Sequence, residues 1–290
     1  MSILSTAVLG AFPTLPLAVS MKAESLAGKG SHLTNSLLFA ALVAGGIIWF
    51  VRGALAKKET VPSGRQNFLE LIVEFLYGQV ESLVGKKVAP SAFPLLATLF
   101  IFILVSNWTG LLPGVADIGW GEGRSWSLHE VHRPILRPLT ADLNGTLAMT
   151  LVVFAAWIFF TVRETGVWGF LVHTFGPKGG LKGFMGLVMI VIFFAVGLIE
   201  LFSILLRNVT LPMRLYGNIY AGENVLHTMM GMLAGKGPVV SFLGSVLIPL
   251  PFYFMELLVG ILQAMVFTLL TAVYIKLSTT HDDHGEEHHH

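Results

Sequence analysis

The chain has 290 residues, of which 54% are hydrophobic and only 12% are charged, and its formal net charge is +1. Soluble domains average about 25% charged residues, so this composition is typical of an integral membrane protein. The near-neutral charge, with no basic patch, argues against a nucleic-acid-binding protein. The chain has no cysteine, which excludes disulfides, thiol nucleophiles and cysteine metal sites.

Both ends of the chain have unusual sequences. The N-terminal "MSILSTAVLGAFPTLPLAVS" has no basic residue before its apolar part, although a signal peptide requires one. We therefore expect a short retained segment, and cleavage is the alternative. The C-terminal "HDDHGEEHHH" could bind a metal ion, but a solvated tail or an appended remnant is the simpler interpretation.

The first predicted membrane span covers residues 34–55, because a spanning helix needs about 20 apolar residues. Basic residues lie at its end and after it: Arg52, Lys57, Lys58 and Arg65. Such residues gather on the cytoplasmic side of membranes, so the N-terminus is expected to face outward.

The next predicted helix covers residues 65–86 and has a narrow polar stripe. The stripe consists of Asn67, Glu70, Glu74 and Glu81. Carboxylates are costly in the middle of a bilayer, which favours an amphipathic helix at the cytoplasmic interface. A packed helix of the kind found in soluble proteins is the alternative.

Two further spans are predicted over residues 92–112 and 143–162. The loop between them is polar, contains Trp120 and Trp126, and has balanced charges, so we expect it outside. The Gly-rich segment after the third span should return to the cytoplasm, because its charges are mostly basic. These basic residues are Arg163, Lys178 and Lys182.

Residues 183–233 and 238–277 form two apolar stretches that are longer than a perpendicular span requires. Two such helices joined by the Gly-rich "AGKGP" predict a strongly tilted hairpin, since tilt accommodates excess length. Alternatively, Pro212, or Pro249 with Pro251, breaks these stretches into shorter helices. We thus expect the whole chain to be one all-α membrane domain with five transmembrane helices and one interfacial helix.

Polar residues recur within the first arm of the hairpin. Glu200, Arg207 and Arg214 are seven residues apart, so they share one face of a regular helix. Glu223 lies nine residues after Arg214 and points to nearly the opposite side, and His227 shares the face of Glu223. A buried Glu200–Arg207 pair that only fixes helix packing is one interpretation of part of this pattern.

The second arm carries Glu256 and Gln263 on one face, with Gly260 between them to permit close approach of another helix. A charge at the middle of a membrane helix costs at least ~2.5–3.5 kcal/mol on insertion scales. Several such charges in one hairpin therefore indicate a functional site.

The chemistry of these side chains divides them into two groups. The Arg214 guanidinium keeps its proton in proteins, so it can only be a fixed positive charge that attracts a carboxylate and repels a cation. Glu223, His227 and Glu256 titrate, and they suit a water-filled path that handles protons. The hairpin therefore has one face with a fixed cation and one with exchangeable protons.

The strings "MRLYGNIYAGE" and "ILQAMVFTLLTAVY" resemble the a subunit of rotary F-type ATP synthases. The basic region after the first span, the interfacial helix, "SNWTGLLP", "TADLNGT" and the long hairpin occur in the order typical of that family. The resemblance covers nearly the whole chain. It implies an interfacial helix and five membrane helices, with the last two steeply tilted against a rotating ring of c subunits.

The resemblance also implies a mechanism with two offset aqueous half-channels. A proton enters from outside, protonates a ring carboxylate, travels almost a full turn and leaves on the other side. Arg214 matches the essential arginine of the family, which holds the deprotonated ring carboxylate and prevents a direct leak. The implied partners are the c-ring, subunit b of the peripheral stalk, the rest of the F1F0 complex and the lipid bilayer, with no cofactor and no nucleic acid.

The resemblance also implies roles for four other residues of the hairpin. Asn218 and Gln263 match the polar partners near the arginine. Glu223 and Glu256 match the pair that lines the outer half-channel, where two close carboxylates cannot easily both ionise. Either one is protonated, or a cation such as charged His227 balances them.

Three more positions are implied with the same family pattern. Asp142 and Asn144, at the outer start of the third span, are expected to line the outer half-channel. Glu200 matches a glutamate near the inner half-channel. A bacterial plasma membrane, with the N-terminus outside and the C-terminus in the cytoplasm, is the expected location, and an organelle inner membrane is the alternative.

Two other functions compete with a non-catalytic subunit. A stand-alone ion channel or secondary transporter also explains polar residues in the membrane, but it predicts a complete pathway within one chain or its homo-oligomer. An intramembrane metallohydrolase could use Glu223 and His227 as ligands, but no third ligand with a clear catalytic pattern appears and "HExxH" is absent. The chain also has no P-loop, so ATP chemistry is expected elsewhere in the complex.

Overall fold

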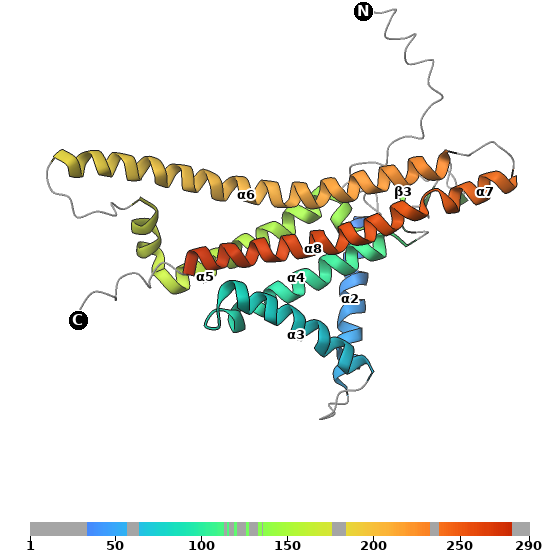
Figure 1. Cartoon of the computed structure of the whole chain (residues 1–290), viewed down its shortest axis with the longest axis horizontal. Helices are drawn as coiled ribbons and strands as arrows, with labels where there is room; N and C mark the ends of the chain where they lie inside the picture. Colours follow the sequence, from blue (N-terminus) through green and yellow to red (C-terminus); the bar gives the residue numbers. More distant parts are fainter. Residues whose placement is uncertain are drawn as a thin grey trace, which may run out of the picture.

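The computed structural model describes residues 34–56, 64–112, 115, 119–120, 126–127, 133–134, 136–175, 184–232 and 238–279. Within them the helices are α2 (Asn35–Leu55), α3 (Arg65–Val84), α4 (Ala89–Gly110), α5 (Leu143–Phe175), α6 (Phe184–Gly231), α7 (Pro238–Leu247) and α8 (Leu250–Thr279) (Figure 1). A 3-10 turn, η1 (Leu139–Ala141), precedes α5.

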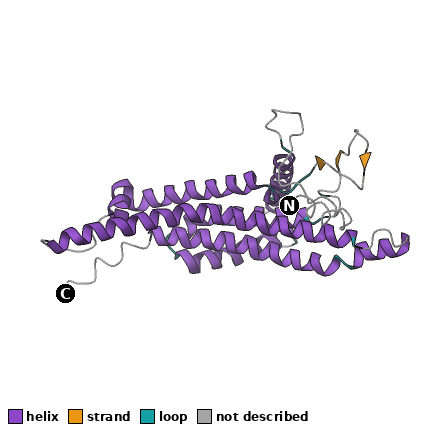
Figure 2. Ribbon diagram, turned by 90° about the horizontal axis from the view of Figure 1, so that it is seen from above, coloured by secondary structure: helices purple, strands orange, loops and turns teal. Residues whose placement is uncertain are grey.

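The loop between α4 and α5 contains three two-residue strands, which pair antiparallel in the order β2-β1-β3. They are β1 (Gly119–Trp120), β2 (Trp126–Ser127) and β3 (Arg133–Pro134). Trp120 and Trp126 face each other in the register of β1 and β2. Figure 2 shows these strands to one side of the helices, so they add nothing to the helical core.

Five segments are long and apolar enough to cross a membrane, which confirms the predicted all-α membrane protein. They are Asn35–Leu55, Ala89–Gly110, Leu143–Arg163, Val191–Met230 and Leu243–Lys276. Many large apolar side chains on α6 and α8 are exposed, including Phe202 and Leu258. Apolar side chains on such helices are suited to contact lipid or another protein subunit.

The first two helices begin close to the positions expected from the sequence. Thr34 caps α2, where its Oγ1 accepts a hydrogen bond from the Leu37 backbone N–H at 3.3 Å. On α3, the side chains of Asn67 and Glu70 are exposed, whereas Val80 and Val84 are buried. The polar stripe is therefore on a different face from the residues that pack against the other helices.

Helix α5 extends further than the span predicted over residues 143–162. The helical segment continues to Phe175 but contains a sharp kink at Gly166, where φ is 71° and ψ is 160°. This positive φ disfavours residues with a Cβ, so glycine is required at the kink. The helix therefore bends just after Arg163, and the residues beyond the kink, as far as Phe175, are still helical.

The two arms of the predicted hairpin respond differently to proline. Helix α6 is continuous through Pro212, whereas the second arm is interrupted between α7 and α8. Pro249 lies at that interruption and has no N–H to continue the helix, while Pro251 lies in the first turn of α8, where the N–H would be unsatisfied anyway. The expectation of one continuous second helix is therefore wrong.

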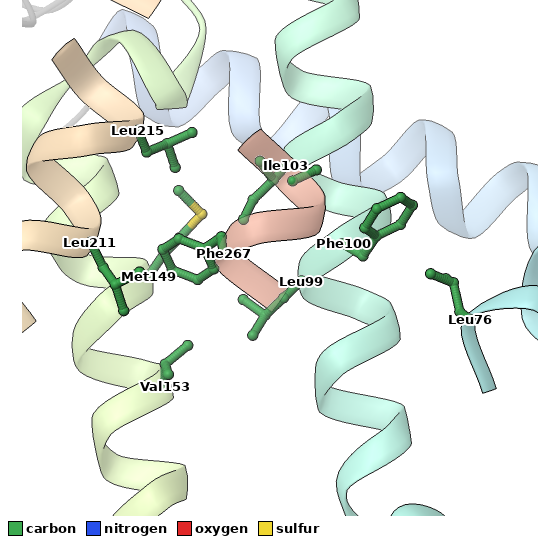
Figure 3. Close-up of a cluster of buried hydrophobic side chains, with 10 residues drawn as sticks. Leu76, Leu99, Phe100, Ile103, Met149, Val153, Leu211, Leu215 and Phe267 are labelled. Carbon is green, nitrogen blue, oxygen red and sulfur yellow. The ribbon is translucent and has the colours of Figure 1, made fainter. Parts of the chain in front are cut away.

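Helix α8 occupies the centre of the fold, where it packs against α3, α4, α5 and α6. The Phe267 ring is fully buried between side chains of neighbouring helices (Figure 3). They include Leu99 and Ile103 of α4, Met149 of α5 and Leu215 of α6. Burying a phenylalanine side chain stabilises a fold by about 1.5–3 kcal/mol relative to water, so this cluster helps to hold α6 against α8.

Candidate functional site

The Arg214 side chain lies exposed on α6. Within the described part of the chain it has no hydrogen-bond or ion-pair partner. Arg207, two turns earlier, behaves differently, because its guanidinium lies over the Tyr274 ring of α8 at 4.8 Å from the centroid. Arg214 is therefore a permanent cation that is available to an acceptor from another chain.

One turn after Arg214, a hydrogen bond joins the two long helices. The Asn218 Nδ2 group donates to Gln263 Oε1 at 3.0 Å, across a sequence separation of 45 residues. The Gln263 side chain is buried on α8, so its orientation is restricted by the surrounding helices. The structure thus brings together the two polar residues that the sequence placed near Arg214.

Glu223 and Glu256 line one small pocket between α4, α6 and α8. Its volume is about 10 Å³, roughly the space needed by one water molecule. The lining residues are Asn107, Gly110, Leu111, Pro138, Ile219, Glu223 and Glu256. Glu256 is 6% exposed and Glu223 is half-buried, so the two carboxyl groups share a confined space whose lining is largely apolar.

The Glu256 carboxyl group lies directly against the backbone of α6. A Cβ added at Gly222 would overlap the carboxyl carbon and both oxygens of Glu256. A side chain at this position would displace the Glu256 carboxyl group, so Gly222 leaves the space in which the glutamate reaches α6. Gly260 has a corresponding position on α8, because a Cβ there would lie 3.4 Å from Asn107 Cβ and Trp108 Cδ1 of α4.

Asp142 is buried at the start of α5 and has two hydrogen bonds. Its Oδ2 accepts from Ser36 Oγ of α2 at 2.8 Å, and its Oδ1 accepts from the Asn144 backbone N–H at 3.2 Å. The second bond is the usual bond of an N-terminal cap. Asp142 therefore joins α2 to α5, and Asn144 contributes its backbone rather than its exposed side chain.

A buried arginine lies beside Asp142. Arg137 is 2% exposed, and its Nη2 donates to the Ala141 carbonyl at 2.9 Å. Pro138, the next residue in the chain, lines the pocket together with Glu223 and Glu256. The start of α5 and the two-glutamate pocket are therefore parts of one neighbourhood.

Two predicted residues lie outside this neighbourhood. Glu200 is exposed on α6 and forms no ion pair with Arg207 in the described structure, so the buried Glu200–Arg207 pair considered from the sequence is wrong. The His227 side chain is outside the described residues. No group of three or more potential metal ligands occurs in the parts of the chain that were described.

Sequence reasoning missed several residues of this neighbourhood: Ser36, Asn107, Arg137 and Gly222. Asn107 belongs to "SNWTGLLP", which we treated only as a marker of family order. An asparagine next to a tryptophan at the end of a membrane helix was the available signal. Ser36 and Gly222 gave no such signal, since their roles depend on residues distant in the chain.

Residues 35–276 match the model of the ATP synthase A chain family. The chain belongs to this family. Its relatives include the protein named ATP synthase subunit a of Protochlamydia amoebophila, which is 34% identical over 251 residues, covering 85% of this chain and 81% of that protein.

Proteins with the same name in other organisms are similar to a comparable extent. That of Pseudomonas putida strain GB-1 is 34% identical over 248 residues, covering 83% of this chain and 81% of that protein. The protein of Gloeobacter violaceus is 32% identical over 229 residues, which cover 79% of this chain and 77% of that protein. The region that matches the family model, residues 35–276, includes all five candidate membrane spans of the described chain.

Proposed function

We propose that this integral membrane protein is the stator subunit a of a rotary F-type ATP synthase, and that it guides protons to and from carboxylates of a c-ring. One observation carries the proposal. Arg214 is exposed and has no partner in the described chain, while the polar Asn218–Gln263 contact lies one turn away. A fixed cation in this position requires an anionic partner from another subunit.

The two-glutamate pocket supplies the outer half of the path. Glu223 and Glu256 line it together with Pro138, which follows the buried Arg137 in the chain. Two carboxyl groups in one confined space favour holding at least one proton, because they cannot easily both ionise. A proton that enters here passes to a ring carboxylate, and we expect His227, one turn after Glu223, to act on the same path.

Arg214 separates this outer path from the inner one. It holds the deprotonated ring carboxylate and repels protons that would cross directly. A charge that falls through 100 mV releases about 2.3 kcal/mol, which a leak would waste as heat. Glu200 lies fourteen residues before Arg214 on the same helix, and we assign it to the inner half-channel. Its side chain is exposed, which is necessary for a residue that water must reach.

A stand-alone channel or transporter explains the structure less well. Such a protein would complete its pathway with residues of its own chain or of identical copies. Here, the carboxyl group of Glu256 is turned into the pocket and against Gly222, so it is not the partner of Arg214. A ring of separate subunits supplies the missing carboxylate, and subunit b would anchor the protein to the rest of the complex.

The same proposal places the protein in a bacterial plasma membrane with the N-terminus outside and the C-terminus in the cytoplasm. The basic residues after the first span support this orientation. Reporter proteins fused at each end, one active only outside the cytoplasm and one only inside, test the orientation directly.

The experiment that tests the proposal compares Arg214→Ala with the unmodified protein in membrane vesicles that contain the intact complex. ATP-driven proton pumping and passive proton leak are measured together. Pumping is expected to fall to background, while ATP hydrolysis or leak continues without coupling to rotation. Arg207→Gln is the matched control, since that arginine has a partner, Tyr274, within the chain.

Pumping that survives Arg214→Ala at near the unmodified rate would show that the arginine is structural, and the proposed mechanism would be wrong. Equal loss in Arg207→Gln and Arg214→Ala would show that any arginine on this helix is needed for assembly. The amount of the subunit in the purified complex must therefore be measured for both variants.

A further inference from the structure

We propose that Asn107 is a further residue of the outer proton path, and that its carboxamide oxygen orients the hydroxyl or water that carries a proton between Glu223 and Glu256. The inference rests on the proposed function of the pocket. It assigns a task to "SNWTGLLP", the motif at the end of α4 that the mechanism above does not use.

The orientation of the Asn107 amide is determined by α8. Its Nδ2 donates to the Gly260 carbonyl at 3.4 Å, and a carbonyl can only accept, so the nitrogen must be the atom that faces α8. The oxygen is thereby left for other partners. Oδ1 is buried and has no hydrogen-bond partner within the described residues.

The position of Asn107 beside the pocket indicates that the donor to Oδ1 is a water molecule or a protonated carboxyl group. Asn107 is 3% exposed and lines the same pocket as Glu223 and Glu256, which has room for about one water molecule. A buried acceptor without a donor is costly, and the groups that can donate in this pocket are a protonated carboxyl group and water. Both are carriers of the proton that the path conducts.

The amide itself neither gains nor loses a proton. A protonated glutamate or a water molecule donates its O–H to Asn107 Oδ1. This hydrogen bond fixes the orientation of the donor relative to the second glutamate. When the proton moves to that second carboxylate, the first becomes an acceptor and releases Oδ1, which then receives the next donor. The acceptor thus favours the proton-carrying form at each step.

A purely structural role is the competing explanation, because Asn107 also anchors α8. The neighbouring Trp108 provides a comparison, since its Nε1 donates to the Leu257 carbonyl of α8 at 3.2 Å. If Asn107 acts only by holding α8, the loss of the Trp108 bond should have a similar effect. If the carboxamide oxygen matters, only Asn107 should be sensitive.

The test uses vesicles that contain the intact complex with Asn107→Leu, which keeps a similar volume but has no amide. Proton flux is normalised to the amount of subunit a that assembles. We expect a loss of about tenfold in ATP-driven pumping, the equivalent of one hydrogen bond to a proton-carrying group. Trp108→Phe and Ser106→Ala, a buried neighbour that is not part of the pocket lining, are expected to retain near-unmodified pumping.

A second measurement covers the case in which Asn107→Leu does not assemble. The chain has no cysteine, so Asn107→Cys introduces a single thiol into this subunit. Silver ions added from the outer side are expected to block proton flux in Asn107→Cys, but not in Ser106→Cys or the unmodified complex. An assembled Asn107→Cys complex that no longer conducts protons has the same meaning as the loss in Asn107→Leu.

Three results would overturn the inference: normal pumping in Asn107→Leu, an equal loss in Trp108→Phe, or flux in Asn107→Cys that silver does not affect. These results are separable from a failure of the proposed function. If Arg214→Ala abolishes coupled pumping while Asn107→Leu pumps normally, only the role of Asn107 is wrong. If Arg214→Ala pumps normally, the proposed function itself is wrong.

Discussion

The contact between Gly222 and Glu256 makes a sharp prediction for Gly222→Ala. The added methyl group would overlap the carboxyl carbon and both oxygens of Glu256, and real Cβ atoms essentially never lie within 3.0 Å of another heavy atom in this way. The carboxyl group must therefore move. Glu256 is only 6% exposed, and the adjoining pocket has a volume of about 10 Å³, so little space is available to receive it.

The magnitude follows from these two facts. Overpacking of a buried site typically costs about 1–3 kcal/mol, and part of this cost is expected in the stability of the α6–α8 contact. Proton transfer suffers more, because a displacement of about 1 Å at a reacting group can reduce a rate by about a hundredfold. We expect coupled pumping to fall between about tenfold and a hundredfold.

The assay is ATP-driven proton pumping in vesicles, normalised to assembled subunit. Gly45→Ala on α2 is the control, since no atom lies within 4 Å of a Cβ at that position. The double variant Gly222→Ala with Glu256→Asp should regain part of the lost pumping, because the shorter side chain makes room for the methyl group. Unmodified pumping in Gly222→Ala, or a double variant worse than either single one, would refute the reasoning.

Two predictions concern stability, measured as the thermal unfolding of the purified complex. Ser36→Ala should destabilise the protein by about 1–3 kcal/mol, because it removes the 2.8 Å donor to the buried Asp142 carboxylate, whereas Ala at the exposed Ser91 should have little effect. Gly166→Ala should cost about 1–2 kcal/mol through the positive φ at the kink, while Gly78→Ala, in regular helix with open space, should be neutral or stabilising. Equal effects in a variant and its control would contradict either interpretation.

Local sequence patterns were sufficient for the elements and for several candidate residues. The lengths of the apolar runs predicted the five membrane spans, because a helix that crosses a bilayer needs about 20 apolar residues regardless of its neighbours. The helical repeat alone is sufficient to place Glu200, Arg207 and Arg214 on one face of their helix.

The tertiary structure decided which of these residues meet and which helices are interrupted. Asn218 meets Gln263 across 45 residues, and Ser36 meets Asp142 across 106, so neither contact leaves a local periodic signal. The rotation of α8 about its axis turns Glu256 toward α6, where the glycine of "IYAGE" leaves space for the carboxyl group. Helical periodicity determines the face on which a side chain lies, but only the packing of one helix against another determines what that face contacts.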